Sequence, residues 1–490
     1  MSSAYISNSL FFFVLIFGYQ LFGNDLDIKS SPQNTVQDSF YPDFMQKRIT
    51  TSNGKGIILF DTSGVNAIDT TDSNGNSIPD FIEYVDSAFV RSWFFEIDSL
   101  GHKEPLLIEG WHLPFPIYIQ ENSELYGATY FVQPGVQNGE FTRFPSYMQI
   151  NPHMERLLPV DDINDALRVT IAHELYHAIQ LSYGIRFQDG NFADLWLLEA
   201  TATAFEEFVY DEVNDYYQHL DKLQSLPWSK GLIRSFADAY YGNAIFYIMI
   251  SEQLGHLDFM IDIWQEQFEY PGEEIVERIV QINGLDFNNI IGDYSIWRYF
   301  TGSKWQAGFY SEGMNYPEIS FFEPISVTDI FPHNNIENWG FEIHYFETVE
   351  AVSISINDYP FMIYNTISEK MDWFNKGKSA ILEPNDSYLI VIWDADLPFN
   401  FSTFEGELKY AFPNPALIKI HDIVTILGCR TEEQVDIFNI VGQKIIRLKA
   451  DSNGALHWDF KDSRGVIVGS GLYIFYLNSS KTKVKSLILK

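Results

Sequence analysis

The spacing of hydrophobic and polar residues changes along the chain and predicts regions of different structure. Between residues 161 and 286 apolar residues recur at helical intervals. A helix is predicted to begin after Asp161 or Asp162 and to end at Tyr183, with Gly184 behind it. Further helices are predicted over 195–210 and 243–254. From about residue 310 apolar and polar residues alternate, as at 352–356 and 388–392, which predicts short β-strands.

The region before the helices mixes both patterns. It predicts a helix around 84–98 and strands at 116–119 and 146–150. The strand at 146–150 is either an edge strand, onto which another extended chain could pair, or an ordinary strand inside a sheet. The predicted fold class is therefore multidomain, with an α+β domain over residues 51–310 followed by all-β sandwich-like modules over 311–409 and 410–490.

The N-terminus carries a short apolar run at residues 10–17, followed by Gly18 and Gly23. A run of this length fits the hydrophobic part of a signal peptide ending near residue 23 and is too short to cross a bilayer, although a buried strand is the alternative. Residues 24–50 are polar and predict an N-terminal extension. No other stretch approaches the roughly 20 apolar residues of a transmembrane helix, so none is expected in the mature protein.

Charge and cysteine content narrow the possible partners. The 490 residues include 31 Lys and Arg against 66 Asp and Glu, a formal net charge of −35. Such a surface repels nucleic acid and anionic lipid but suits a protein that meets divalent cations. Cys429 is the only cysteine, so an intramolecular disulfide and a cysteine-based zinc site are both excluded.

Candidate chemistry lies in the first long helix, in the sequence His173-Glu174-Leu175-Tyr176-His177. Two histidines four residues apart lie on one helical face and can bind one zinc ion. Glu174 lies beside the first ligand and could act as general base toward a metal-bound water. The flanking residues are apolar, and burying these polar groups would be costly unless they were paired or bound to metal.

A third ligand is predicted at Glu199, 21 residues after His177, in a strongly apolar helix rich in alanine. A carboxylate in such a segment needs a reason, because the alternative is a solvated helix residue. Small residues at 200, 202 and 204 would let this helix approach the first one closely. Separately, Tyr241 is a candidate donor to a tetrahedral oxyanion, with a packed aromatic pair as the alternative.

These motifs, His-Glu-x-x-His followed by Trp-Leu-x-Glu and a later glutamate, resemble the gluzincin metallopeptidases, in particular a group of secreted bacterial enzymes. The resemblance implies His173, His177 and Glu199 as zinc ligands and Glu174 as catalytic base. Glu206 matches the later glutamate and is implied to orient a ligand. Thr203 stands where the family often has an aspartate that orients a histidine.

A second metal is suggested by an oxygen-rich loop at residues 72–83. Side chains with oxygen atoms stand at loop positions 1, 3, 5, 9 and 12, and a backbone carbonyl is available at position 7, the spacing that calcium prefers. The predicted ligands are Asp72, Asn74, Asn76, the Ile78 carbonyl, Asp80 and Glu83. Ser77 stands at position 6, where EF-hand loops have glycine. The segment is similar to calcium loops of secreted bacterial proteins, and a solvated turn is the alternative.

The C-terminal segment is similar to the sorting domains of the type IX secretion system. The similarity rests on Phe-Pro-Asn-Pro at 412–415, Asn-Ile-Val-Gly-Gln at 439–443, Asp-Ser-Arg-Gly at 462–465 and Gly-Leu-Tyr at 471–473. It implies the type IX secretion machinery as a partner, with export through the periplasm and outer membrane to the cell surface or medium.

Together these features predict a secreted zinc endopeptidase that acts on a protein or peptide substrate. One alternative is a catalytically silent surface adhesin or binding protein that keeps the same fold. Another is a zinc hydrolase of a glycan or an ester.

Overall fold

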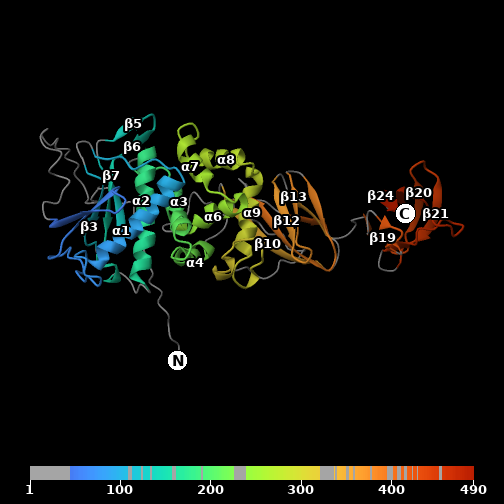
Figure 1. The fold of residues 1–490 in the computed structure, drawn as a ribbon. Coiled ribbons are helices and arrows are strands. Elements are labelled where there is room, and N and C mark those ends of the chain that lie inside the picture. Colours follow the sequence, from blue (N-terminus) through green and yellow to red (C-terminus); the bar gives the residue numbers. More distant parts are fainter. Residues whose placement is uncertain are drawn as a thin grey trace, which may run out of the picture. The chain divides into compact units, whose positions relative to one another are not determined.

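A computed structural model shows how these segments fold (Figure 1). The chain divides into two compact units, one comprising residues 1–320 with 337–341 and the other 321–336 with 342–490. The predicted signal peptide, residues 1–23, lies outside the described residues. The structure describes residues 45–108, 113–122, 125–132, 135–156, 162–188, 191–225, 239–319, 336, 339–348, 352–356, 359–375, 378–393, 401–404, 410–412, 416–421, 423–427, 429–451, 455–479 and 481–490.

A five-stranded sheet begins the first unit, in the order β1-β2-β3-β7-β4. Strands β2, β3 and β7 are parallel to one another, whereas β1 and β4 pair antiparallel at the two edges. The strands are β1 (Lys47–Thr50), β2 (Gly56–Phe60), β3 (Phe115–Ile119), β4 (Gly127–Phe131) and β7 (Ser146–Ile150). The last four residues of the predicted polar extension are thus part of this sheet.

The sheet order corrects the edge-strand alternative for residues 146–150. Strand β7 pairs with β3 on one side and with β4 on the other, so its backbone groups are already used. The edge belongs instead to β4, which precedes β7 in sequence and folds back antiparallel along it. The hydrophobic pattern of a strand reports its two faces, not its neighbours, so it could not distinguish the two arrangements.

The helices of the first unit pack against this sheet and against one another (Figure 1). Helix α1 (Asp80–Trp93) continues into a π-helical segment, Phe94–Ser99, and packs along α2 (Ile163–Tyr183). The Asp162 side chain caps α2 by accepting from the backbone N–H of Asn164 at 2.8 Å. The other helices are α3 (Leu195–Val209), α4 (Tyr217–Ser225), α5 (Ala239–Gly242), α6 (Ala244–Leu254), α7 (Asp258–Glu266), α8 (Glu273–Ile282) and α9 (Phe287–Tyr299).

Helices α2 and α3 form the buried centre of this unit. Ala172 and Ala178 on α2 are 0% exposed, as are Ala202 and Ala204 on α3. Small side chains let two helix backbones approach closely, which brings polar side chains of both helices within reach of each other. A smaller sheet contains β5 (Val136–Asn138), β6 (Phe141–Arg143), β8 (Ile185–Gln188) and β9 (Asn191–Phe192) in that order and contacts α2 through β6.

The second unit is built from β-sheets. One pair of sheets contains β10 (Phe341–Thr348), β15 (Asp386–Trp393), β12 (Phe361–Asn365) and β13 (Lys370–Phe374), and β14 (Ser379–Leu382), β11 (Val352–Ile356) and β16 (Phe401–Phe404). A second pair contains β17 (Tyr410–Phe412), β19 (Val424–Leu427) and β22 (Leu456–Trp458), and β18 (Ala416–Leu417), β24 (Thr482–Leu489), β23 (Gly471–Leu477), β20 (Gln434–Asn439) and β21 (Lys444–Lys449). Each pair encloses its own apolar core, the second around Trp458. The observed fold is therefore mixed α+β with β-sandwiches.

Two further points concern the last module and the membrane. Residues 413–415, in the Phe-Pro-Asn-Pro motif before the last module, lie outside the described residues. Across the described parts of the chain, no helix combines the length and the apolar character that crossing a bilayer requires.

Candidate metal centre

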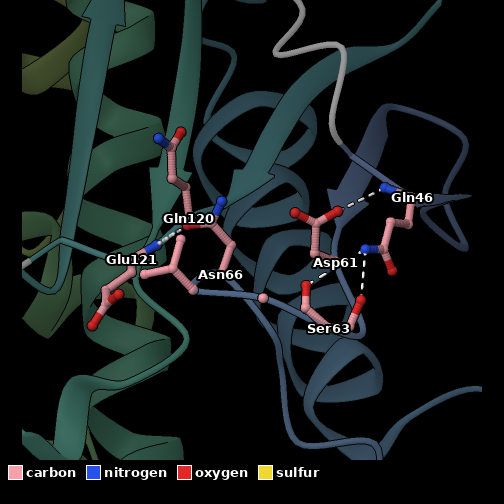
Figure 2. Close-up of a pocket in the computed structure, with 8 residues that line it drawn as sticks. Gln46, Asp61, Ser63, Asn66, Gln120 and Glu121 are labelled. Carbon is pink, nitrogen blue, oxygen red and sulfur yellow. Dashed lines mark hydrogen bonds between the residues drawn. The ribbon is translucent and has the colours of Figure 1, made fainter.

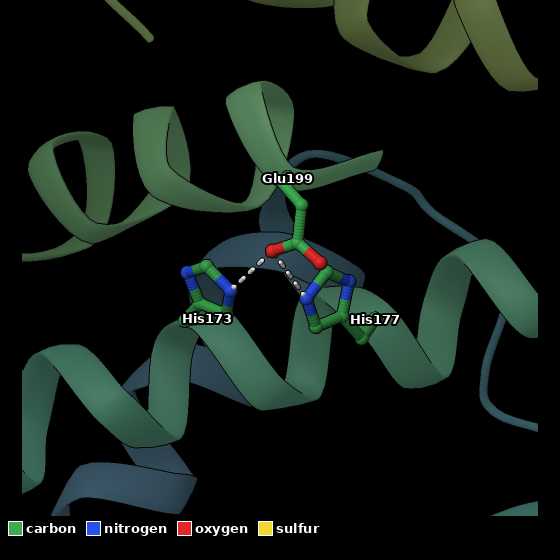
Figure 3. A group of neighbouring side chains, drawn as sticks. All are labelled: His173, His177 and Glu199. Atoms are coloured by element: carbon green, nitrogen blue, oxygen red, sulfur yellow. Dashed lines mark ion pairs between the residues drawn. The ribbon is translucent and has the colours of Figure 1, made fainter. Parts of the chain in front are cut away.

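Three side chains from α2 and α3 converge at the centre of the first unit (Figure 3). The Nε2 atoms of His173 and His177 each lie 3.4 Å from Oε2 of Glu199. All three residues are buried, with exposures of 0% or 1%. In the part of the chain that the structure describes, this is the one group of three His, Cys, Asp or Glu ligand atoms within 4.8 Å of one another.

The spacing and donor set fit a small tetrahedral ion. Ligands about 2.0–2.1 Å from a tetrahedral centre lie about 3.3–3.4 Å from each other, and zinc takes this geometry with imidazole and carboxylate ligands. The two observed separations of 3.4 Å match that edge length. They exceed the 2.7–2.9 Å typical of a charge-assisted hydrogen bond. The site therefore has the dimensions to hold a metal ion, while the identity of that metal is a separate question.

The opposite nitrogen of each imidazole is held by a neighbouring side chain. Nδ1 of His173 lies 2.7 Å from Oε1 of Glu206, and Nδ1 of His177 lies 2.7 Å from Oε1 of Gln180. Gln180 in turn donates to the backbone carbonyl of Leu198 at 2.9 Å. When Nδ1–H donates to these oxygens, the lone pair of each Nε2 faces Glu199.

Glu206 thus lies where the sequence expected a ligand-orienting group, whereas Thr203 does not. The Thr203 side chain is fully buried, and within the described residues its hydroxyl makes no hydrogen bond. Both Nδ1 atoms are already held by the carboxylate and the amide. Gln180 was missed, although its position three residues after His177 on the same helix was a usable signal.

Burial and charge give the two histidines different protonation behaviour. Burial lowers the pKa of His173 to about 4, so its imidazole is neutral at physiological pH. Burial also opposes a charge on His177, but the charge and hydrogen bond of Glu199, together with Glu174 and Gln180, outweigh it and raise the pKa of His177. Burial would raise the pKa of Glu199, yet the neighbouring histidines lower it to about 2. In the metal-free site, Glu199 thus favours the protonated form of His177, and the histidines favour the ionised form of Glu199.

Glu174 lies on the sheet side of α2 with its carboxylate unpaired. Both of its oxygens are buried and form no hydrogen bond to the described residues. Burial raises the pKa of its carboxyl group to about 7. Its backbone carbonyl accepts from the Thr129 hydroxyl on β4 at 2.7 Å. The approach of β4 requires Gly127, where an added Cβ would lie 3.2 Å from Cγ of Glu174 and 2.6 Å from Cγ2 of Thr170.

Two aromatic rings extend the site from α4 and α5. The Tyr241 ring lies 6.2 Å from the His173 ring, and the His219 ring stacks on Tyr241 at 5.0 Å. Nε2 of His219 is buried and makes no hydrogen bond within the described residues. The Tyr241 ring therefore lies beside the histidine site, while its role as a donor stays a prediction. His219 also lies there, and the sequence analysis did not predict it. His219 lies in an ordinary polar helix, so no sequence signal marked it.

The oxygen-rich loop at residues 72–83 folds separately from this site. Asp72 accepts from the backbone N–H groups of Gly75, Asn76 and Ser77, and Ser77 has the left-handed φ of 71° that its loop position requires. Asp80 accepts from Ser73, while the amide groups of Asn74 and Asn76 donate to Glu83. The loop is compact, and calcium binding there stays a prediction.

A polar pocket of about 500 Å³ lies elsewhere on the first unit, after the ends of β2 and β3 (Figure 2). Its lining groups hydrogen-bond to one another. The backbone N–H of Gln46 donates to Asp61, its side-chain amide donates to Ser63, and the N–H of Glu121 donates to Asn66. None of the three metal-site residues lines it, so it is distinct from the metal centre.

Comparisons with known proteins add little to this geometry. Neither a protein-family model nor a curated protein matches the chain. A solved structure of PorZ, a surface component of the type IX secretion system of Porphyromonas gingivalis, is 24% identical over 21% of this chain and 15% of its own, with a TM-score of 0.15. The Epf adhesin domain of Streptococcus pyogenes is 8% identical over 30% of this chain and 71% of its own, with a TM-score of 0.14. A Ruminococcus gnavus β-glucuronidase is 9% identical over 41% of each chain, with a TM-score of 0.15. At these scores none of the three supports a functional assignment.

Proposed function

We propose that the chain is a secreted zinc-dependent endopeptidase of the gluzincin type. The observation that carries the proposal is the meeting of His173, His177 and Glu199 at tetrahedral spacing, with the unpaired Glu174 on the same helix. Structural zinc sites have four protein ligands, whereas catalytic sites have three and leave one position open. Three ligands within the described residues therefore favour the catalytic kind.

The residues around the site have separate parts in the proposed reaction. Bound zinc would supply a water of lowered pKa and polarise the scissile carbonyl. Glu174 would accept the proton of that water and pass it to the leaving amine, a task suited to a carboxyl whose pKa is about 7. Tyr241, whose ring lies 6.2 Å from the His173 ring, and His219, which stacks on Tyr241, would donate hydrogen bonds to a developing oxyanion.

The substrate class is inferred from the sheet beside the site. Strand β4 is the antiparallel edge of its sheet and contacts Glu174 through Thr129 and Gly127. An extended peptide can add to such an edge by backbone hydrogen bonds, which favours a peptide over a glycan or ester. Because the ligand side chains are at most 1% exposed, a substrate reaches them only when surrounding elements open.

The test compares Glu174→Gln with wild type on an unfolded protein substrate. We expect the variant to lose at least about 100-fold in kcat/KM while still binding zinc, because only the base is removed. Wild-type activity should disappear with a chelator and return with zinc. Glu96→Gln is a matched control, since Glu96 is also fully buried and unpaired but lies in the π-helical segment.

Three outcomes separate the candidate functions. Full activity in Glu174→Gln would refute the mechanism. If zinc-loaded wild type cleaves no peptide but hydrolyses an ester or a glycan, the substrate is an ester or a glycan and not a peptide. A protein that binds zinc and hydrolyses none of these would be the silent binding protein.

Export is a separate part of the proposal. The motifs at 412–473 and the β-sandwich over 416–490 support a type IX sorting domain. Deleting residues 410–490 should leave the protein in the periplasm of a host that has this system, whereas the full chain should reach the surface or medium. Equal export of both forms would contradict the assignment.

A further inference from the structure

The polar pocket on the first unit has features of a small-molecule site that the proposed hydrolysis does not use (Figure 2). It lies where the parallel strands β2 and β3 end, and residues 61–66 and 120–121, which follow these strands, form most of its lining. Loops at the carboxyl ends of parallel strands are where open α/β sheets bind ligands. The volume of about 500 Å³ is within the roughly 300–1,000 Å³ of small-molecule pockets.

The lining is held in place by its own hydrogen bonds, so the pocket is formed before a ligand binds. The backbone N–H of Gln46 donates to Oδ1 of Asp61 at 2.7 Å, and the N–H of Ile68 donates to the Asp61 carbonyl at 3.1 Å. On the β3 side, the N–H of Glu121 donates to Oδ1 of Asn66 at 3.1 Å. A preformed site loses little conformational entropy when its ligand binds.

These hydrogen bonds leave one polar atom of each buried side chain unused. Asp61 and Asn66 are only 5% and 6% exposed. Within the described residues, Oδ2 of Asp61 accepts no hydrogen bond and Nδ2 of Asn66 donates none, yet neither atom is fully enclosed. Because both residues line the pocket, these atoms open into it (Figure 2). The side chain of Gln120, also in the lining, likewise makes no hydrogen bond in the described part of the chain.

The mixture of unused donors and acceptors selects the class of ligand. A metal ion or an amine would suit the Asp61 carboxylate but would face the N–H groups of Asn66, which repel a cation. An anion would suit Asn66 but would be repelled by Asp61. The second carboxylate in the lining, Glu121, is paired with Arg156 at 2.9 Å and so adds little net charge. A hydroxyl group both donates and accepts, so neighbouring hydroxyls of one neutral molecule satisfy both free atoms.

We propose that this pocket binds a neutral sugar unit of monosaccharide size. Sugar hydroxyls would donate to Oδ2 of Asp61 and accept from Nδ2 of Asn66, and the amide of Gln120 would take either part. Val65, which is 70% exposed and lines the same pocket, offers an apolar surface to the C–H groups of a sugar ring. The sugar would be either a free molecule or the end unit of a glycan.

The experiment applies saturation-transfer NMR to the full chain. The probes are glucose, galactose, mannose and N-acetylglucosamine, each as the free sugar and as its methyl glycoside. We expect transfer to at least one of these neutral sugars, and weaker transfer to the charged glucosamine and glucuronic acid. Transfer to free sugars alone would identify a free sugar as the ligand, whereas transfer to both forms would identify the end of a glycan. The signal should persist with a chelator, because none of the three metal-site residues lines this pocket.

Three variants test the pocket, and one is a control. Asp61→Asn keeps the oxygen that the loop uses and turns the free acceptor into a donor, so sugar affinity should fall at least about 10-fold. Asn66→Asp makes the opposite change and should shift the preference from the neutral sugar toward glucosamine. Gln120→Ala removes a side chain without hydrogen bonds of its own among the described residues, so it should fold normally and weaken binding about 2- to 10-fold. Asp98→Asn, exposed in the π-helical segment, should bind as wild type does.

The proposal fails if no neutral sugar gives a signal, or if glucosamine binds and the neutral sugars do not. It also fails if Gln120→Ala, shown by circular dichroism to be folded, binds the sugar as tightly as wild type, whether or not Asp61→Asn folds. A signal that a chelator abolishes and the pocket variants retain would place the sugar at the histidine site and overturn the proposal. None of these outcomes depends on whether the histidine site cleaves peptides.

Discussion

Replacing Glu206 by glutamine should weaken zinc binding without unfolding the protein. Glutamine has nearly the same shape and can still accept from Nδ1 of His173 across the 2.7 Å contact. Burial raises the pKa of the Glu206 carboxyl group in the metal-free protein, whereas a dication bound to His173 would favour its ionised form. Glutamine cannot supply that negative charge to an imidazole that carries part of the charge of the dication. The variant thus isolates the electrostatic contribution of the carboxylate from its packing.

The expected loss of zinc affinity is about 10- to 100-fold, or about 1.4–2.7 kcal/mol. The expected loss lies at the upper end of that range, because His173 and Glu206 are both 0% exposed and no solvent screens their interaction. Competition with a chromophoric chelator at pH 7.5 measures the affinity, and circular dichroism confirms the fold.

Glu207→Gln is the matched control. It changes a neighbouring buried glutamate on the same helix, one that makes no hydrogen bond to either histidine within the described residues. Wild-type zinc affinity in Glu206→Gln, or an equal loss in Glu207→Gln, would refute the role given to the 2.7 Å contact.

Two further predictions concern the same site. Zinc affinity should fall about tenfold per pH unit as the pH drops below the raised pKa of His177, because zinc displaces one proton there while His173, with a pKa of about 4, stays neutral. Chelator competition between pH 5.5 and 7.5 checks this, and a slope of two protons or none would contradict it. Gly127→Ala should destabilise the first unit by about 1–3 kcal/mol, because the new methyl group would lie 2.6 Å from Cγ2 of Thr170. Its activity should fall more than its zinc affinity, as read by Tm and kcat/KM. Gly469→Ala, where a Cβ meets nothing within 4 Å, is the control.

The sequence predicted the helices and the grouping of His173, His177 and Glu199 well because both leave signals in local spacing and composition, while metal binding by this group stays a prediction. Helix α2 ends at Tyr183 as expected and begins one residue after its predicted cap, and α3 and α6 differ from expectation by one residue at an end. The i, i+4 spacing of His173 and His177 fixes their shared face directly. Glu199 could be predicted because a carboxylate in an alanine-rich helix is conspicuous.

What the sequence could not predict depends on contacts between distant segments. Strand order decided that β4, not β7, is the edge of the sheet, and alternating residues carry no information about neighbours. His219 reaches the site only through its stacking on Tyr241.

The amide of Gln180 has a consequence for which metals the protein accepts. It holds His177 with its oxygen and the carbonyl before Glu199 with its nitrogen, so it fixes α2 and α3 in register before any ion arrives. Alanines between the helices leave little room to spread them. An ion that prefers longer bonds and more oxygen donors would have to push this packed pair apart. At the proposed metal site, the helix interface would therefore favour small ions with few ligands.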